Sequence, residues 1–574
     1  MWTLLVVQVL TALAAAPAEP GASPITAWMK RNAQPFDTCA PSDHVKDLAP
    51  LRQMVGKARI VALGEGTHGT REFFQLKHRI TQYLAAEMGF TVFSIEASLP
   101  EAWRLNDYVL GGEGDPRALI KGMYFWTWNT EEVLEMVEWM RRFNMEKRGR
   151  IEFTGFDMQT PDTAAAIVRR FLARHEPAWA ESVAALQKMS PRDPGFVTST
   201  GTLPVRDFAG HKVRYSGFVR TVKVTGFAGL WMRADAGREH SVAFDNMQSQ
   251  NVTGTTDWKR HAIELAIPAN TDNVNFGVLM SAEGTAWFDS LAIEVDGKPW
   301  TSEDIDLALE ATGGPKGLGR VSMHPRYTIA MDYSIAASGS LSLRLSGVPP
   351  GPGFDAGLGV AARRRLLDHL EASRARLGAV STPAQADWVI RNAHVLLQQG
   401  LNQTESSGTV RDSSMAANIM WIVDEARKGS KVVLWAHNMH VARKQGAMGK
   451  WLADRYGKDL VVVGFAANEG MYTAWKAGAV LSNNPLSPGP PGSLESFAHD
   501  TGVPRFLLDL REARKDPEVE TLLRSGVSMR SIGAMSMEAQ FYPVPVLDFY
   551  DVLAWVDQTG PSRQLGGLGA VPRK

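Results

Sequence analysis

The sequence predicts a mixed α/β protein into which an all-β domain is inserted. Residues 24–190 alternate short apolar runs with long helical patterns, which is typical of a parallel or mixed sheet flanked by helices. Between residues 193 and 350 the chain changes to short β-rich runs separated by turns, typical of a jelly-roll sandwich. The helix–strand alternation then returns. We therefore expect one α/β catalytic domain formed by residues 24–190 and 355–574, with residues 193–350 inserted between its two parts.

The first part of the α/β domain is predicted from three apolar runs and two helical patterns. The runs at 58–65, 90–98 and 150–159 are short, apolar and bounded by turn residues, so they predict strands. Residues 72–89 place apolar side chains at helical spacing. Residues 129–147 begin with acidic and end with basic side chains, as the helix dipole favours.

Apolar runs also predict the strands of the insertion and of the second part of the α/β domain. After the sandwich, apolar runs at 430–440 and 459–470 predict two more strands, and the Pro- and Gly-rich residues 483–493 predict a flexible excursion. The β-rich runs of the insertion are 211–224, 227–235, 261–268, 274–281, 285–295 and 326–347.

The N-terminal segment predicts export. Residues 1–18 contain an apolar run that is too short to span a bilayer comfortably. The run ends in small residues, and Ala16-Pro17-Ala18 fits the cleavage site of a secretory signal peptide, although no Lys or Arg precedes it. We therefore expect a periplasmic or extracellular protein that has no membrane span after cleavage.

Composition limits the classes of partner. Lys and Arg together number 61, as do Asp and Glu, so net charge gives no reason to expect nucleic acid. Cys39 is the only cysteine, which excludes a disulfide within the chain and a cysteine-based metal site. Composition therefore argues against nucleic acid as a partner and leaves the substrate open.

Acidic and imidazole side chains follow several predicted strands. The residues at these strand ends are Glu65, His68, Glu96, Asp157, His437 and His440. Because ligands bind beyond the carboxyl ends of parallel strands, we expect these side chains to share one cleft. A histidine held by a carboxylate is a good general base near neutral pH, and it can activate water against a carbonyl carbon. Lys77, Arg411 or a second histidine is expected to stabilise the oxyanion.

Other hydrolytic mechanisms lack their motifs in this sequence. There is no G-x-S-x-G nucleophile elbow, no H-E-x-x-H and no G-x-x-x-x-G-K-[ST] phosphate loop. Two histidines and two glutamates are sufficient ligands for zinc, so a divalent metal remains an alternative. Neither histidine pair has the helical i, i+4 spacing of a zinc motif, however, and we expect no metal or other cofactor.

Six sequence blocks follow one another in this order along the chain: "ALGEGTHGTREFFQLKHRI", "FSIEAS", "YFWTWNTEEVLEMVEWMRRFN", "GFDMQ", "RDSSMAANIMWI" and "VVLWAHNMHV". Together they resemble the erythromycin esterase family. The resemblance covers most of residues 50–185 and 385–475. It implies an enzyme that hydrolyses the lactone ester of macrolide antibiotics, in a deep cleft of an α/β domain, through a histidine base and water.

The resemblance also implies roles for individual residues. His68 matches the base, while Glu65 and Glu96 would orient it or balance its charge. Lys77 stands where some members carry arginine. His437 and His440 match the histidines of the "AHN" block, with His437 catalytic and His440 binding. Arg411, Asp412, Trp126 and Trp128 fall in blocks expected to line the cleft, with core packing an equal alternative for the two tryptophans.

Three functions remain open at this point. The first is a carboxylic ester hydrolase, acting on a macrolide lactone or another bulky ester. The second is a metal-dependent hydrolase of the same fold. The family's antibiotic-resistance members lack an inserted sandwich, and this insertion resembles carbohydrate-binding jelly-roll modules. The third function is therefore a glycan-binding envelope protein with an inactive α/β scaffold.

Overall fold

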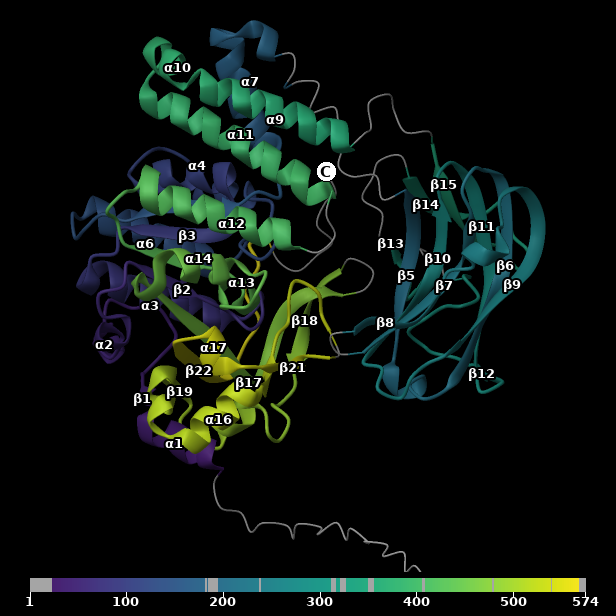
Figure 1. Cartoon of the computed structure of the whole chain (residues 1–574). Coiled ribbons are helices and arrows are strands. Elements are labelled where there is room, and N and C mark those ends of the chain that lie inside the picture. The colour runs from purple at the N-terminus through teal and green to yellow at the C-terminus, as the bar shows by residue number, and fades with distance from the viewer. Residues whose placement is uncertain are drawn as a thin grey trace, which may run out of the picture.

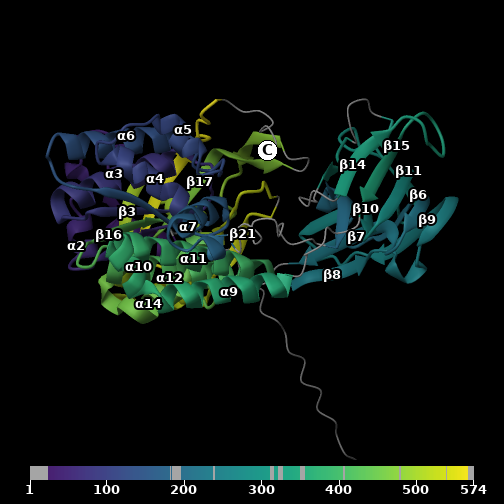
Figure 2. The same cartoon turned by 90° about the horizontal axis from the view of Figure 1, so that it is seen from above.

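The computed structural model shows an α/β part with a β-sandwich to one side of it in both views (Figures 1 and 2). The structure describes residues 23–180, 183, 195–236, 239–310, 316–320, 327–348, 356–404, 408–476, 480–537 and 539–566. The predicted signal peptide lies outside the described residues. Among the helices that are described, none combines the length and the apolar character needed to cross a lipid bilayer.

The α/β part is built on a mixed nine-stranded sheet, which confirms the predicted fold class. Its order is β1-β19-β22-β17-β2-β16-β3-β4, with β18 paired to β17. The strands from β22 to β4 pair in parallel, whereas β1, β18 and β19 pair antiparallel. Their bounds are β1 Gln34–Pro35, β2 Ile60–Leu63, β3 Val92–Ser98, β4 Glu152–Asp157, β16 Val432–Trp435, β17 Leu460–Lys476, β18 Val480–Leu486, β19 Arg505–Asp509 and β22 Val552–Thr559.

Apolar sequence explains the middle of this sheet. Strands β2, "IVAL", and β16, "VVLW", are buried at every residue. Val61 and Leu63 enter one hydrophobic core, while Ile60 and Ala62 enter a second core. Side chains alternate between the two faces of a strand, so the continuous apolar run is what a strand covered on both faces requires.

Helices cover both faces of the sheet. Helix α3 begins directly after the glycine-rich turn and ends at Met88, before Gly89, whose left-handed backbone favours glycine. Helices α7, α9 and α11 share a core of their own near one end of the sheet (Figure 1). The bounds are α1 Pro24–Asn32, α2 Leu51–Val55, α3 Arg71–Met88, α4 Leu99–Val109, α5 Pro116–Lys121, α6 Glu131–Met145, α7 Asp162–His175, α9 Ala356–Ala372, α10 Arg374–Val380, α11 Pro383–Thr404, α12 Thr409–Trp421, α13 Asn438–Val441, α14 Met448–Tyr456, α15 Leu494–His499, α16 Pro517–Ser525 and α17 Val546–Phe549.

The sandwich consists of two antiparallel sheets around a separate core. Their orders are β13-β5-β10-β7-β8 and β14-β15-β11-β6-β9, with β12 paired to β11. The segment 327–347 forms two strands rather than one run, and its second strand pairs with β11. The bounds are β5 Phe196–Leu203, β6 Lys212–Val224, β7 Ala228–Ala236, β8 Glu239–Asp245, β9 Gly254–Ala266, β10 Asn273–Ser281, β11 Gly284–Val295, β12 Lys298–Trp300, β13 Gly319–Arg320, β14 Tyr327–Asp332 and β15 Ser342–Gly347.

Two features of the C-terminal region differ from the sequence-based expectation. Strand β17 continues past residue 470 to Lys476, and β18 pairs with this extension, so Asn483 and Asn484 lie in a strand rather than in a flexible excursion. A separate hairpin, β20 Val527–Arg530 with β21 Phe541–Val544, follows. The residues just after β20 reach the site described below.

Candidate active site

A glycine-rich turn after β2 positions Glu65 and His68. A side chain at Gly64 would place its Cβ 2.1 Å from Asn438 Oδ1, and one at Gly69 would place it 1.9 Å from the carbonyl oxygen of Thr473. Both contacts are far inside van der Waals distance. Only glycine therefore lets this turn pack against the segment after β16 on one side and against β17 on the other.

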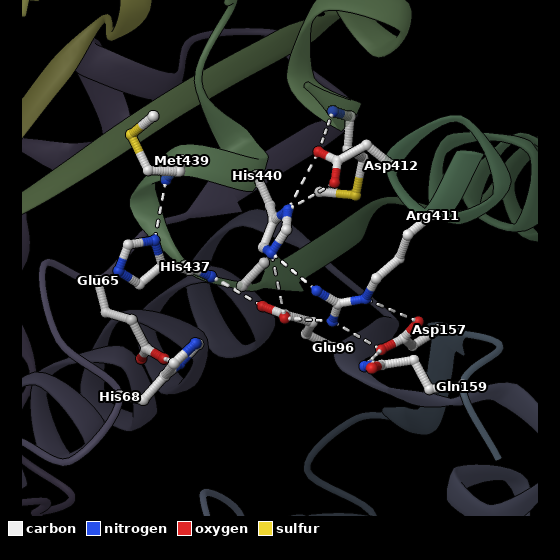
Figure 3. A network of polar contacts seen from close by, with 12 residues as sticks. Glu65, His68, Glu96, Asp157, Gln159, Arg411, Asp412, His437, Met439 and His440 are labelled. Carbon is white, nitrogen blue, oxygen red and sulfur yellow. Dashed lines mark hydrogen bonds and ion pairs between the residues drawn. The ribbon is translucent and has the colours of Figure 1, made fainter. Parts of the chain in front are cut away.

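The predicted convergence of the strand ends is observed (Figure 3). Strands β2, β16, β3 and β4 are neighbours in this order, so their carboxyl ends lie along one edge of the sheet. The backbone nitrogen of His437 donates to Glu96 Oε2 at 3.0 Å, although 341 positions separate the two residues. The rings of His68 and His437 are 4.9 Å apart between centroids.

Glu65 and His68 form a carboxylate–imidazole pair. Nδ1 of His68 lies 2.8 Å from Glu65 Oε1, so the hydrogen bond places the ring proton on Nδ1. Nε2 then carries the lone pair, and within the part of the chain that the structure describes it makes no hydrogen bond. The His68 side chain is 12% exposed, whereas Glu65 is completely buried. The pair thus presents a basic nitrogen from a fixed ring.

Two donors bind the carboxylate oxygen of Glu65 that does not contact His68. Lys77 Nζ and Trp435 Nε1 donate to Glu65 Oε2 at 2.6 and 2.9 Å. Burial lowers the pKa of Lys77 to about 8, against the opposing charge of Glu65, so the amine is still charged at neutral pH. Lys77 has no exposed surface. The structure thus places Lys77 against Glu65, with no surface exposed to solvent, and its binding role stays a prediction.

Arg411, from α12, joins two carboxylates at the ends of β3 and β4. Its Nη2 donates to Glu96 Oε1 at 2.7 Å and to Asp157 Oδ2 at 2.8 Å. Burial alone would raise the pKa of Glu96, but the charges of His440 and Arg411 hold it well below its usual value. The Arg411 side chain is 21% exposed, so this cation reaches the solvent while its carboxylate partners stay buried.

His440 lies between Asp412 and Arg411. Its Nδ1 is 2.9 Å from Asp412 Oδ1, and its Nε2 is 3.1 Å from Arg411 Nη1 and 3.4 Å from Glu96 Oε1. The neutral ring accepts from Arg411 through Nε2, whereas the protonated ring faces Glu96 with an N–H. Nε2 of His440 therefore has a hydrogen-bond partner in both protonation states of the ring. Burial lowers the pKa of His440, but the charge of Glu96 and the bond to Asp412 outweigh it and raise the pKa.

The raised pKa of His440 predicts a pH-dependent contribution to stability. The contribution is complete below the unfolded-state pKa of about 6.5 and is lost as pH rises through the higher folded-state pKa. His440→Gln is therefore expected to reduce the free energy of unfolding more at about pH 6 than at about pH 9, measured by urea unfolding. His44→Gln, which changes an exposed side chain, is the control. A loss that is the same at both pH values would contradict this prediction.

His437 uses both of its ring nitrogens within the protein. Nδ1 accepts from the backbone nitrogen of Met439 at 3.2 Å, and Nε2 lies 3.0 Å from the carbonyl oxygen of Ile532, to which it donates. Burial and the neighbouring His68 lower its pKa well below the usual value. The ring is therefore neutral, and neither nitrogen is available to a substrate. His437 lies in the site, as expected, but this geometry gives it a positioning role.

The two predicted tryptophans differ. Trp128 is buried, donates from Nε1 to the carbonyl oxygen of Glu96 at 2.8 Å, and meets the His68 ring edge-on at 6.1 Å. Trp128 therefore belongs to the hydrophobic core and also packs against the His68 ring. Trp126 is half-buried, and no described contact joins it to the site residues.

Sequence reasoning missed several partners of the site. Trp435 ends the apolar run of β16, where a buried tryptophan N–H needs an acceptor. The sequence therefore indicated that Trp435 bonds to a buried polar group. Gln159, which donates to Asp157 Oδ2 at 2.7 Å, lies two residues after the end of β4. The carbonyl of Ile532 carried no signal, because a backbone group in a loop has no sequence signature.

Every carboxylate of the site is paired with a protein cation or imidazole. Glu65 pairs with Lys77, and Glu96 and Asp157 pair with Arg411. Asp412 pairs with His440. Within the described ranges, no group of three or more His, Cys, Asp or Glu side chains is placed to hold a metal ion. Among the described residues, Lys77 and Arg411 are cations paired with the carboxylates at this sheet edge.

A histidine whose ring is held by a carboxylate can act as a general base. The family model described as Erythromycin esterase matches residues 85–206 and 357–559, more than half of the chain. The chain therefore belongs to the erythromycin esterase family. Glu96, Arg411, His437 and His440 lie within the matched residues, whereas the turn that carries Glu65 and His68 precedes them.

Individual relatives support the same assignment. An Escherichia coli protein named erythromycin esterase type II is 32% identical over 133 residues, which are 23% of this chain and 31% of that protein. A Bacillus subtilis (strain 168) protein named putative hydrolase YbfO is 35% identical over 133 residues, 23% of this chain and 29% of that protein. The chain thus matches about a third of the length of these curated relatives. A crystal structure of a Bacillus cereus protein, 18% identical, shares the fold with a TM-score of 0.60, covering 94% of this chain and 98% of that one.

Proposed function

We propose that this protein is a carboxylic ester hydrolase in which His68 activates a water molecule. The observation that carries the proposal is the 2.8 Å contact between Glu65 Oε1 and His68 Nδ1, which leaves Nε2 free to act as the base. A positioned general base of this kind contributes about 10²–10⁴-fold to a rate. Membership of the erythromycin esterase family supports the same activity.

The reaction has two steps in this proposal. Nε2 of His68 takes a proton from water while the water oxygen bonds to the ester carbonyl carbon. Glu65 stabilises the imidazolium that forms, as a buried carboxylate does for a catalytic histidine. The tetrahedral intermediate then breaks its bond to the alkoxide, which takes the proton from His68 Nε2. The products are a carboxylic acid and an alcohol, or one hydroxy acid if the substrate is a lactone.

Arg411 is the proposed binding group for the carbonyl oxygen, and His440 is a positioning residue beside it. The Arg411 side chain is 21% exposed, whereas both ring nitrogens of His440 are used within the protein. Glu96, Asp157 and Asp412 fix them in place. Donors held in this way are effective because they need no rearrangement when negative charge develops on the oxygen.

A bulky ester is the substrate class that the relatives favour. The Escherichia coli relative is named an erythromycin esterase, and a macrolide lactone is therefore the first substrate to test. The shared fold does not fix the substrate by itself, so a simple aryl ester is the second.

The activity test uses the purified full chain with 4-nitrophenyl butyrate and with erythromycin, each in the presence and absence of a metal chelator. We expect release of nitrophenolate, or addition of one water to the macrolide by mass spectrometry, at equal rates with and without chelator. The physical reason is that Lys77 and Arg411 already neutralise the carboxylates that would bind a metal. Failure to hydrolyse either ester contradicts the proposal. Loss on chelation that zinc or manganese restores favours the metal-dependent alternative.

A further inference from the structure

A cavity lies between α3, α6 and the loop at residues 41–43. Its volume is about 470 Å³, which is within the range of pockets that hold small molecules. The two helices lie side by side in both views (Figures 1 and 2). The described residues that line this cavity include none of the active-site residues above, so the cavity is a separate feature of the α/β part.

Hydrogen bonds join the walls of the cavity to one another. Arg79 of α3 is buried and donates from Nη2 to the carbonyl oxygen of His44 at 2.8 Å, which anchors the loop to the helix. Gln82 lies about one turn further along α3. With its amide oriented to suit both neighbours, it donates to the carbonyl oxygen of Ser42 and accepts from Trp139 Nε1 on α6, each at 3.3 Å. The loop, α3 and α6 therefore form a preformed pocket.

His78 is a buried polar side chain of this cavity that has no partner in the protein. It is 2% exposed, and within the described part of the chain neither of its ring nitrogens makes a hydrogen bond. Burial, with the charge of Arg142, lowers the pKa of His78 to about 3, so the ring is neutral at physiological pH. A neutral imidazole has one N–H donor and one acceptor nitrogen. Unpaired buried polar groups are rare because they are costly, so His78 indicates that the cavity receives a hydrogen-bonding group.

The charges around the cavity favour a neutral ligand. Its charged lining residues are Asp43, Glu135, Glu138 and Arg142. Arg148 pairs with Asp43. Arg563 pairs with Glu135. Glu138 lies one helical turn before Arg142 on α6, where opposite charges offset each other. An anion would meet more negative than positive lining charge, and a cation would compete with the arginines that already neutralise the carboxylates.

The uncharged lining residues favour an aromatic ligand. Leu134 and Trp139 of α6 are buried members of the hydrophobic core that also line the cavity. The rings of Trp139 and His78 are 5.4 Å apart between centroids and are tilted by 52°. Aromatic rings prefer tilted and edge-to-face neighbours at such distances, so a third ring can pack against this pair.

From this geometry we propose that the cavity between α3 and α6 binds a small neutral phenol, whose hydroxyl bonds to His78 and whose ring packs against Leu134 and Trp139. A hydroxyl both donates and accepts, so it can bond to either nitrogen of the neutral imidazole. A phenol with a pKa near 10 is uncharged at neutral pH, as the lining charges require. The proposal does not depend on the ester hydrolase activity.

The test is isothermal titration calorimetry of the full chain at pH 7 with 4-methylphenol, 4-methylbenzoate and 4-methylbenzylamine. These three compounds share one ring and differ in charge. We expect saturable binding of 4-methylphenol and weaker or no binding of the anion and the cation. The physical reason is that the cavity offers a neutral hydrogen-bonding ring and no charge that lacks a counterpart.

Two variants locate the binding in this cavity. His78→Phe keeps a ring but removes both nitrogens, and it is expected to weaken 4-methylphenol binding by about 2–10-fold, as loss of one hydrogen bond does. Leu134→Trp fills the cavity from α6 and is expected to abolish binding. Near-ultraviolet circular dichroism checks that each variant is folded. His78→Phe is expected to fold because it removes a buried polar group that has no protein partner.

Two matched controls make the same changes on exposed positions. His211→Phe alters an exposed histidine of the sandwich, and Leu522→Trp enlarges a 38% exposed leucine of α16. Both are expected to bind 4-methylphenol like the wild type. The proposal is overturned if the wild type shows no saturable binding of 4-methylphenol, or if either charged compound binds more tightly. It is also overturned if a folded His78→Phe or Leu134→Trp variant binds 4-methylphenol as tightly as the wild type.

Discussion

Replacing His68 by asparagine is expected to lower kcat/KM for an ester substrate by about 10²–10⁴-fold. The asparagine amide keeps a donor toward Glu65 but provides no basic nitrogen to take a proton from water. The measurement is the initial rate of nitrophenolate release by variant and wild type at equal concentration. Because His68 is partly exposed and its main partner is Glu65, the substitution is expected to leave the fold intact.

His44→Asn is the matched control for this experiment. His44 is an exposed histidine before α2, and its substitution is expected to leave kcat/KM within about twofold of the wild type, as for surface changes away from a site. Full activity of the His68 variant would refute the assignment of the base. A decrease of equal size in both variants would show that the loss is not specific to the site.

Replacing Lys77 by methionine is expected to cost about 3–5 kcal/mol of folding stability, as removal of one partner of a buried ion pair does. Lys77 and Glu65 are both fully buried, with Nζ 2.6 Å from Oε2. Methionine fills a similar volume but leaves the Glu65 carboxylate without its cation, and Trp435 Nε1 alone remains bonded to that oxygen. The measurement is the midpoint and slope of urea unfolding. Activity should fall as well, because Glu65 orients His68.

The control for Lys77 is an exposed ion pair of the same length. Lys450 Nζ lies 2.6 Å from Asp454 on the surface of α14. Lys450→Met is expected to change stability by about 1 kcal/mol or less, because solvent screens such pairs. A Lys77 variant that unfolds at the same urea concentration as the Lys450 variant would contradict the structural role assigned to this lysine.

The sequence predicted the fold class and the meeting of the strand ends for one physical reason. Runs such as "IVAL" and "VVLW" are apolar at every position, which a strand of a parallel sheet requires because both of its faces are covered. Parallel strands place their carboxyl ends at one edge, so the polar residues that follow these runs converge. That argument needs no knowledge of which strands are neighbours.

Contacts that depend on neighbours could not be predicted in this way. The burial of Lys77 beneath Glu65 follows from the packing of α3 against the sheet, and the engagement of the His437 ring follows from the position of Ile532. The extension of β17 past Gly470 was missed because glycine usually ends a strand pattern. Here the residue lies so close to Thr559 that a Cβ would be 2.1 Å from its carbonyl oxygen, which explains why glycine is required within the strand.

The position of β2 in the sheet has a consequence for the order of folding. Both neighbours of β2 in the sheet, β16 and β17, begin beyond residue 430. The whole sandwich lies between β2 and these partners along the chain, and it has a hydrophobic core of its own. The sandwich can therefore fold as a unit before β2 is paired, whereas β2 gains its partners only when the part of the chain beyond residue 430 returns to it.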